Sequence, residues 1–455
     1  MATLSHPPLL LRGGTVLTLD AAATVLPAAD LLIENRRIAV VGTAPEIPEA
    51  RVLDVAGCLV LPGLIQGHLH LGQTFFRGLG EGRRLLAWLR ERIWPLEASH
   101  DDESAYWCGL LGAAECLLGG TTTIQDIGIG PGAPGLLRAI ADSGLRAFAG
   151  PCLMDCGAEL PAPMRGDTDA VLANAEALGD RFEGEGAGRL RTVLNPRFIL
   201  TCSDPLWEGI RDLAARRGWP VHTHGLEQQD ETLAVRGIKN GRDEIEYFSD
   251  QGVLGADFRL AHGVWLTSAH LDRVRGGRFS VVHCPSSNLK LGSGIADVLA
   301  IRRAGVPVGI GTDGAACSNQ LDNFAELRLA ALLQSLKHGP DAFSGLDALR
   351  LATSEGARAL GLQRETGSIE PGKAADLVVL SCDRPELWGA AEADPHDLVA
   401  FGSSRGAVRH VIVDGRLLVE EGRLTRLDLS EILRESERCL SELIRRSGLT
   451  FPYRR

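Results

Sequence analysis

Apolar and polar residues alternate in two different ways along this chain. The first 60 residues, and again residues 375–380 and 408–416, contain short apolar runs separated by Gly or Asn turns. Such runs are typical of β-strands. Because isolated short β segments are unstable, we predict that the two regions meet in one small β domain formed from both termini, residues 1–60 and 365–425.

Between these regions, strand-like runs alternate with helical stretches such as 101–118 and 205–217. The strand-like runs are residues 58–70, 120–126, 145–151, 190–196, 219–224, 257–262, 279–284 and 306–313. Eight strands with intervening helices predict an α/β fold, namely a (β/α)8 TIM-like barrel over residues 61–364 joined to a small β-sandwich domain. An open doubly wound sheet is the alternative, but no glycine-rich nucleotide-binding turn follows an early strand.

The last residues, 426–455, are predicted to form a C-terminal helix and tail. Apolar residues recur there at helical spacing, at Ile432, Leu433, Leu440, Leu443 and Ile444. An amphipathic helix of this kind is expected to pack on the barrel or on another subunit. The sequence therefore allows both a monomer and a homo-oligomer.

Composition narrows the class of protein. Hydrophobic residues make up 45% and charged residues 23% of the 455 positions, as in soluble globular proteins. The formal net charge of −11 argues against a nucleic-acid partner, and the chain has no run of about 18 apolar residues that would span a membrane. The N-terminus lacks a secretory signal pattern. The ten Cys are scattered without a Cys-x-x-Cys pair, which is typical of the reducing cytoplasm. We therefore expect a cytoplasmic protein that acts on a small molecule.

The apolar run 61–67 ends in His68-Leu69-His70. In a strand, residues i and i+2 point to the same face, so both imidazoles would project together and form half of a metal site. A lone His-x-His can equally be two hydrogen-bonded polar residues at a strand end. The other predicted strand ends decide between these interpretations.

Further ligand-type residues lie at those ends. The fifth strand ends in His224, with Glu227 three residues later, the sixth in His262, the seventh in His283 and the eighth in Asp313. Three His and one Asp would suit zinc, or alternatively iron, with one position left for water.

These motifs resemble those of the amidohydrolase superfamily, in its branch of metal-dependent deaminases and triazine hydrolases, which includes guanine deaminase-like and deoxyadenosine deaminase-like proteins. Further matching segments are Pro62-Gly63, residues 283–291, residues 311–314 and residues 367–377. The match runs in order over about residues 8–425.

The resemblance implies that one divalent metal, Zn²⁺ or alternatively Fe²⁺, is bound by His68, His70, His224 and Asp313. It also implies three catalytic residues: Glu227 transfers protons, His262 orients or polarises the water, and Asp313 accepts the proton of that water. Such a site performs hydrolytic deamination of an amino-substituted N-heterocycle.

The substrate is predicted from fewer residues. Gln73 and Arg197 match the amide and guanidinium with which guanine deaminases hold the purine, which favours guanine or 8-oxoguanine. Trp88 and His283 complete the predicted substrate-binding residues.

Three alternatives stay open. The segment around Trp88 is shared with deaminases of adenosine, 5′-deoxyadenosine or S-adenosylhomocysteine, although the acidic residue that nucleoside-deaminating relatives often carry just before this Trp is absent here. The others are an s-triazine amino- or chlorohydrolase and a non-catalytic metal-binding barrel. The loop over residues 150–168 is predicted to overhang the site.

Overall fold

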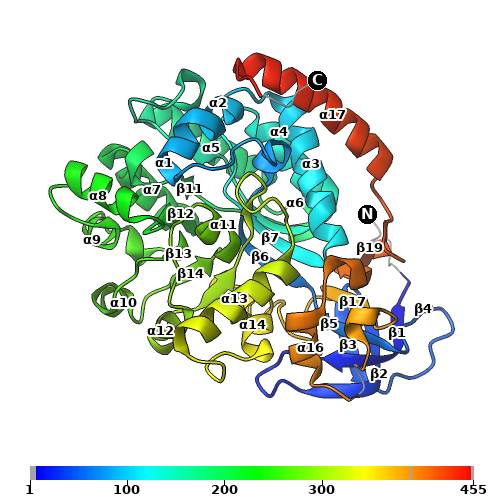
Figure 1. Ribbon diagram of the computed structural model, residues 1–455. Coiled ribbons are helices and arrows are strands. Elements are labelled where there is room, and N and C mark those ends of the chain that lie inside the picture. Colours follow the sequence, from blue (N-terminus) through cyan, green and yellow to red (C-terminus); the bar gives the residue numbers. More distant parts are fainter. Residues whose placement is uncertain (1–6, 390–391, 452–455) are drawn as a thin grey trace. The chain divides into compact units, whose positions relative to one another are not determined.

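The computed structural model describes residues 7–389 and 392–451 (Figure 1). Two compact units divide the chain. Residues 1–66, 115–123 and 322–427 form the first, here called the sheet unit, and residues 67–114, 124–321 and 428–455 form the second, the barrel unit. The domain boundaries predicted from the sequence, at residues 60, 364 and 425, rest on the alternation of strands and helices. They stay a prediction.

The sheet unit contains a nine-stranded sheet built from both ends of the chain. Its strands are β1 (Leu9–Leu17), β2 (Val25–Glu34), β3 (Arg37–Gly42), β4 (Arg51–Asp54), β5 (Cys58–Pro62), β17 (Leu377–Ser381), β18 (Val408–Val413), β19 (Arg416–Glu420) and β20 (Arg423–Leu424). The two ends join where β17 pairs antiparallel with both β5 and β18. Leu11, Leu31, Leu377 and Ile412 meet in one buried cluster. The predicted β domain formed from both termini is confirmed.

The helices of the sheet unit are α13 (Asn323–His338), α14 (Gly345–Leu351), α15 (Ser354–Ala359) and α16 (Pro395–Gly402), with short turns η6 (Pro385–Leu387) and η7 (Arg405–Ala407).

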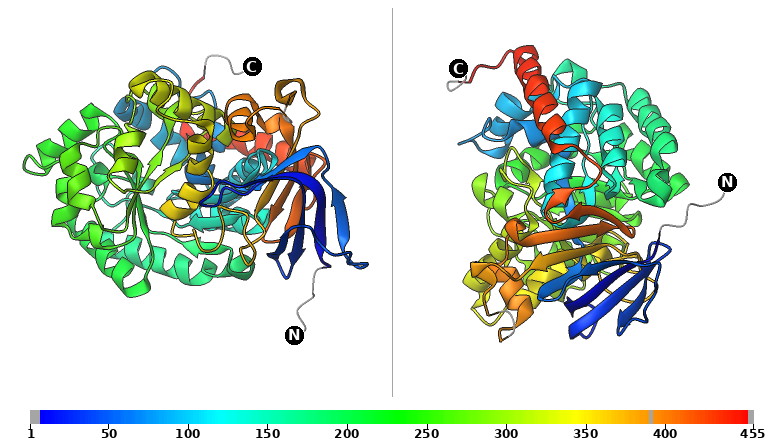
Figure 2. Two further views of the ribbon diagram at one scale, coloured as in Figure 1. Left: turned by 90° about the horizontal axis from the view of Figure 1, so that it is seen from below. Right: turned by 90° about the vertical axis from the view of Figure 1, so that its right-hand side faces the viewer.

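Eight parallel strand positions follow one another around the barrel, which confirms the predicted TIM-like fold (Figure 2). They are β6 (Leu64–His70), β7 (Thr121–Asp126), β8 (Arg146–Ala149) with β9 (Cys152–Leu153), β10 (Leu190–Thr192) with β11 (Asn195–Pro196), β12 (Val221–Gly225), β13 (Phe258–His262), β14 (Phe279–His283) and β15 (Val308–Ile310) with β16 (Asp313–Gly314). The ring closes where Asp313 of the eighth position pairs with Leu69 of the first. Strands β13, β14 and β15 are buried along their whole length, as expected for a parallel sheet covered by helices.

The remaining helices surround these strands. They are η1 (Leu71–Phe76), α1 (Leu85–Trp88), the π-helix η2 (Leu89–Ile93), α2 (Trp94–Glu97), α3 (Asp102–Leu118), α4 (Ala133–Ser143), η3 (Ala162–Met164), α5 (Thr168–Phe182), α6 (Glu185–Gly188), η4 (Ile199–Thr201), α7 (Asp204–Arg217), α8 (Gln229–Ile238), α9 (Glu244–Asp250), η5 (Val253–Gly255), α10 (Ser268–Val274), α11 (Pro285–Lys290), α12 (Val298–Arg303) and α17 (Leu429–Ser447). In the described part of the chain, no helix has the length and apolar character needed to cross a membrane.

The predicted C-terminal helix is α17. It buries Ile432, Cys439 and Leu443, and Arg438 pairs with Glu103 on α3, so the helix packs within the barrel unit. Leu433, which the helical spacing places on the apolar face, is 53% exposed.

A buried histidine makes the stability of the barrel unit depend on pH. The His100 ring lies beside the rings of Phe75 and Phe76, and its Nε2 donates to the carbonyl of Gly72 at 2.9 Å. Its Nδ1 lies 3.1 Å from the Ser104 hydroxyl. Burial lowers the pKa of His100 from its ordinary value of 6.5 to about 4.

We therefore expect the free energy of unfolding to fall between pH 6.5 and pH 4. In this window the unfolded state binds a proton that folded His100 refuses, and the full effect is about 3 kcal/mol. Chemical denaturation at pH 7, 5.5 and 4.5 measures how the free energy of unfolding changes with pH. His100→Gln is the control, because it removes the part of this change that comes from His100. If the free energy of unfolding changed equally with pH in the unmodified protein and in His100→Gln, the prediction would be contradicted.

Candidate active site

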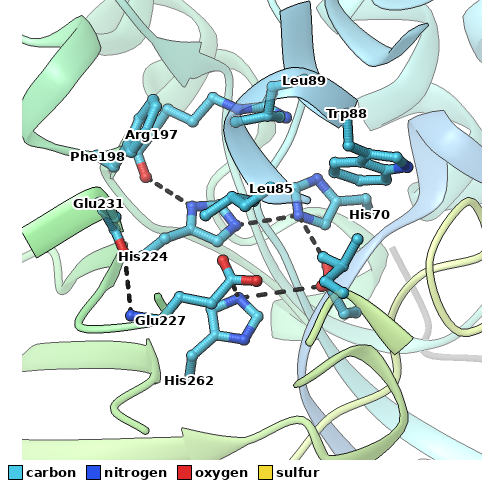
Figure 3. Close-up of a pocket in the computed structure, with 12 residues that line it drawn as sticks. His70, Leu85, Trp88, Leu89, Arg197, Phe198, His224, Glu227, Glu231 and His262 are labelled. Carbon is cyan, nitrogen blue, oxygen red and sulfur yellow. Dashed lines mark hydrogen bonds and ion pairs between the residues drawn. The ribbon is translucent and has the colours of Figure 1, made fainter. Parts of the chain in front are cut away.

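Four side chains that can bind a metal meet at the C-terminal ends of three barrel strands. His68 and His70 come from β6, His224 from β12 and Asp313 from β16, and one ligand atom of each lies within 4.8 Å of the others. Nε2 of His70 is 3.1 Å from Nε2 of His224 and 3.1 Å from Oδ1 of Asp313 (Figure 3). The strand ends therefore bring together the four ligands predicted from the sequence.

Hydrogen bonds at the opposite ring nitrogens aim these imidazoles at one point. His224 Nδ1 donates to the carbonyl oxygen of Arg197 at 2.6 Å, which leaves its Nε2 unprotonated in the neutral ring. His68 Nδ1 lies 3.0 Å from His222 Nε2, and the buried His68 Nε2 faces Asp313 Oδ1 at 3.4 Å. Fixing the tautomer through the far nitrogen is typical of metal-binding histidines.

The protonation states also suit a cation. Burial lowers the pKa of His68 and His70, and lowers that of His224 well below its ordinary value. Burial alone would raise the pKa of Asp313, but its hydrogen bonds with His68 and His70 hold it well below the usual range. Three neutral imidazoles and one carboxylate fit Zn²⁺.

The backbone is unusual at two residues of the barrel rim, His262 in β13 and Asp313 in β16. His262 and Asp313 have φ of 72° and 59°, a left-handed conformation that few residues other than glycine adopt. Such strain is found mostly at functional sites, where the surrounding structure enforces it. Asp313 is held from both carboxylate oxygens: Ser287 Oγ donates to Oδ2 at 2.6 Å and the Gly314 amide donates to Oδ1 at 2.7 Å.

The two predicted proton-handling residues lie beside the four ligands. Glu227 Oε2 is 3.4 Å from His262 Nε2, which in turn is 3.9 Å from Asp313 Oδ2. His262 Nδ1 donates to Asn288 Oδ1 at 2.9 Å, so its Nε2 faces the site unprotonated. Burial and the charge of Asp313 raise the pKa of Glu227 well above its ordinary value. Glu227 can therefore carry a proton at neutral pH.

A second buried carboxyl group holds the main chain at Glu227. Glu231 Oε2 accepts a hydrogen bond from the Glu227 amide at 2.9 Å, at the start of α8. Burial, together with the neighbouring carboxyl of Glu244, raises the pKa of Glu231 well above its ordinary value.

Sequence reasoning missed Glu97, which organises the two residues predicted to hold a purine. Glu97 is fully buried at the end of α2. Its Oε1 accepts from Gln73 Nε2 at 2.8 Å, and its Oε2 accepts from Arg197 Nη1 at 2.6 Å. The available signal was a single carboxylate directly after the apolar stretch Ile93–Leu96, nine positions after Trp88, whereas the acidic residue of nucleoside-deaminating relatives is expected before Trp88.

One pocket adjoins this centre. Its walls include Leu85, Trp88, Leu89, Phe198 and Leu291. Its polar lining comes from His70, Arg197, His224, Glu227, Glu231, His262 and Asp313. Of the four predicted substrate-binding residues, Trp88 and Arg197 line the pocket. Gln73 and His283 are buried and are not among its lining residues.

The loop over residues 150–168 does not line this pocket either. Pro151, Cys152, Met154 and Met164 line a separate cleft of about 340 Å³, and none of these described residues lines the pocket with the metal-binding group. Met154 and Leu160 share one buried cluster with Leu85 and Trp88 of the pocket wall, so the loop packs beside the pocket, and its overhang stays a prediction.

Comparison with known proteins agrees with this architecture. A model of the amidohydrolase family matches residues 59–418. The chain is 36% identical to the 5-methylthioadenosine/S-adenosylhomocysteine deaminase of Halobacterium salinarum over 97% of this chain and 99% of that protein. It is 33% identical to the 5′-deoxyadenosine deaminase of Methanosarcina mazei over 96% of this chain and 99% of that protein.

A solved structure of an adenosine deaminase from Xanthomonas campestris with bound zinc has a TM-score of 0.88 at 29% identity, covering 96% of this chain and 98% of that one. The chain belongs to the amidohydrolase family, and it is a hydrolase of carbon–nitrogen bonds other than peptide bonds, in cyclic amidines.

Proposed function

We propose that this enzyme is a zinc-dependent aminohydrolase that releases ammonia from the 6-amino group of an adenine nucleoside. The favoured substrates are nucleosides with an altered 5′ position: 5′-deoxyadenosine, 5′-methylthioadenosine and S-adenosylhomocysteine. The observation that carries the reaction type is the placement of Glu227 and His262 beside four metal-ligating side chains in one pocket. Relatives that match along nearly the whole chain bear names of this substrate class.

The contacts of Glu97 change the substrate expected from the sequence. Guanine or 8-oxoguanine is the sequence-based prediction because Gln73 and Arg197 could both hold the base. The Gln73 amide nitrogen is instead committed to Glu97, and Gln73 does not line the pocket. Arg197 alone of the pair faces the pocket, with guanidinium donors left for a ring nitrogen or a ribose oxygen. Free guanine therefore becomes the second candidate.

The apolar walls support the same choice. Leu85, Leu89, Phe198 and Leu291 can contact a purine ring and a 5′ group that lacks a hydroxyl, while Trp88 offers an aromatic face. A triazine is less favoured because Glu227 and Asp313, which suit ammonia as the leaving group, are both retained.

Each residue of the site has its own part in the proposed hydrolysis. A zinc ion at His68, His70, His224 and Asp313 would supply hydroxide at neutral pH, since metal binding lowers the pKa of water to about 7. Asp313 accepts the proton of the attacking water. Glu227 donates its proton to the ring nitrogen next to the carbon that carries the amino group. The carbon–oxygen bond forms, the proton held by Asp313 passes to the amino group, the carbon–nitrogen bond breaks and ammonia leaves. The remaining hydroxyl proton returns to Glu227, so the ring nitrogen keeps the proton it received.

His262 has a supporting part in this reaction. Because its Nδ1 proton is held by Asn288, its unprotonated Nε2 can accept a hydrogen bond from the water and fix its direction of attack.

The test is ammonia release by the zinc-loaded enzyme from the three favoured nucleosides, adenosine, guanine, 8-oxoguanine and aminotriazines. We expect kcat/KM for at least one 5′-modified nucleoside to exceed that for every free base by tenfold or more. Chelated enzyme should be inactive and should recover with zinc. Preference for guanine would overturn the nucleoside proposal, and two tightly bound ions per chain would overturn the single-metal site.

A further inference from the structure

We propose that residues 78–89 form a strap across the mouth of the barrel that opens to admit substrate, and that Glu81 and Lys290 are positioning residues that hold it closed. The proposal rests on the pocket being the substrate site and is independent of which heterocycle binds there.

The pocket is too small for a purine in this structure. Its free volume is about 20 Å³, which is enough for about one water molecule. Sites for small-molecule ligands usually measure about 300 Å³ or more. A purine therefore cannot enter until part of the wall moves.

The strap reaches from one side of the barrel mouth to the other. It follows η1 at the end of β6, the first strand position, and Arg84 Nη1 donates to Asp230 Oδ2 at 2.9 Å. Asp230 lies in α8, which follows β12, the fifth position. First and fifth strands are opposite each other in an eight-stranded barrel, so this contact spans the opening.

A second set of contacts holds the strap at the loops that follow the seventh and eighth positions. Lys290 Nζ, at the end of α11, donates to Glu81 Oε1 at 2.8 Å. Asn319, after β16, donates to the same oxygen at 3.2 Å, and it also contacts Lys290. Glu81, Lys290 and Asn319 together are here called the latch.

The same segment supplies one wall of the pocket. Leu85, Trp88 and Leu89 all line it. Gly80 lies directly against the Trp88 indole, because a Cβ atom at Gly80 would be 2.5 Å from Trp88 Nε1. A movement of the strap at the latch therefore moves the aromatic wall of the pocket.

Two glycines give the strap points at which to bend. Gly78 and Gly82 have φ of 76° and 73°, and an added Cβ atom would meet nothing within 4 Å at either position. A side chain would fit at both positions, so the reason for glycine there is the left-handed backbone conformation. Such residues can absorb the dihedral change of an opening motion.

The latch is weak enough to be reversible. The side chains of Lys290 and Glu81 are 29% and 47% exposed. Exposed ion pairs contribute little and are screened by salt. We therefore expect the latch to shift the opening equilibrium by about threefold to tenfold.

The experiment uses zinc-loaded enzyme and needs no substrate. Glu81→Gln, Lys290→Gln and the double variant are compared for hydrogen–deuterium exchange in residues 78–89 and for the rate at which a chelator removes zinc. Each single variant should exchange and lose zinc about threefold to tenfold faster, and the double variant should be no faster, since both changes break one interaction. High salt should make the unmodified enzyme behave like the variants.

Asp272→Asn provides the control, because Asp272 pairs with Arg275 in another exposed ion pair at the end of α10, away from the strap. It should change neither rate. Unchanged rates of exchange and zinc loss in the Glu81 and Lys290 variants would contradict the proposed latch. So would a double variant whose effect equals the sum of the two single effects. Faster exchange throughout the barrel unit would assign the effect to general destabilisation and would overturn it as well. Because zinc loss and exchange are measured without turnover, an error in the proposed substrate would leave these results unaffected.

Discussion

Replacing Glu227 with Gln is expected to lower kcat by about 10³-fold while the enzyme keeps its zinc. General acid–base groups typically contribute about 10² to 10⁴ to the rate. Gln has nearly the same shape as Glu, but it cannot donate an acidic proton to the ring nitrogen. Glu227 is not one of the four residues proposed to bind the metal, so metal content should be unchanged. Steady-state kinetics on the best nucleoside, together with metal analysis, test both parts.

Glu231→Gln is the matched control. Glu231 is equally buried and one turn away, yet its contact with Glu227 is a hydrogen bond that an amide oxygen can also accept. We expect less than a tenfold loss of kcat for this variant. If Glu227→Gln kept its kcat within tenfold of the unmodified enzyme, the proton-transfer role would have to be given to another group.

The barrel strands, and the meeting of four candidate metal-binding residues at their ends, were predictable because they depend on short-range patterns. Continuous apolar runs mark parallel strands, and the spacing of two places His68 and His70 on one face of β6. The C-terminal ends of parallel strands meet at one rim, so His224 and Asp313 could be assigned there without knowing any distance. His222, two residues before His224, lies deeper and contacts His68.

The polar contacts on the substrate side could not be predicted in this way. The position of Gln73 after His70 assigns it to the substrate, but η1 directs its side chain to Glu97. Glu97 and Arg197 are 100 positions apart, and the sequence carries no local pattern that pairs them. The short strands β9, β11 and β16 are likewise defined by pairing with distant partners, not by their own residues.

Replacing Arg197 with Met is expected to lower the free energy of unfolding by about 3 to 5 kcal/mol, the usual cost of removing one partner of a buried ion pair. Glu97 is fully buried and Arg197 is 3% exposed. The Glu97 carboxylate would keep only the hydrogen bond from Gln73, so its charge would have no compensating cation. Chemical denaturation of the metal-free proteins measures the loss without a contribution from zinc binding.

The double variant Arg197→Met with Glu97→Gln separates the charge from the packing. A neutral amide in place of the Glu97 carboxylate leaves no buried charge, so most of the lost stability should return. Activity should not return with it, because Arg197 lines the pocket and would still be missing. A single variant that costs less than about 1 kcal/mol, or a double variant that is no more stable than the single one, would show that Glu97 takes up a proton or reaches solvent when Arg197 is absent. In that case the ion pair would be a feature of substrate recognition and not a support of the fold.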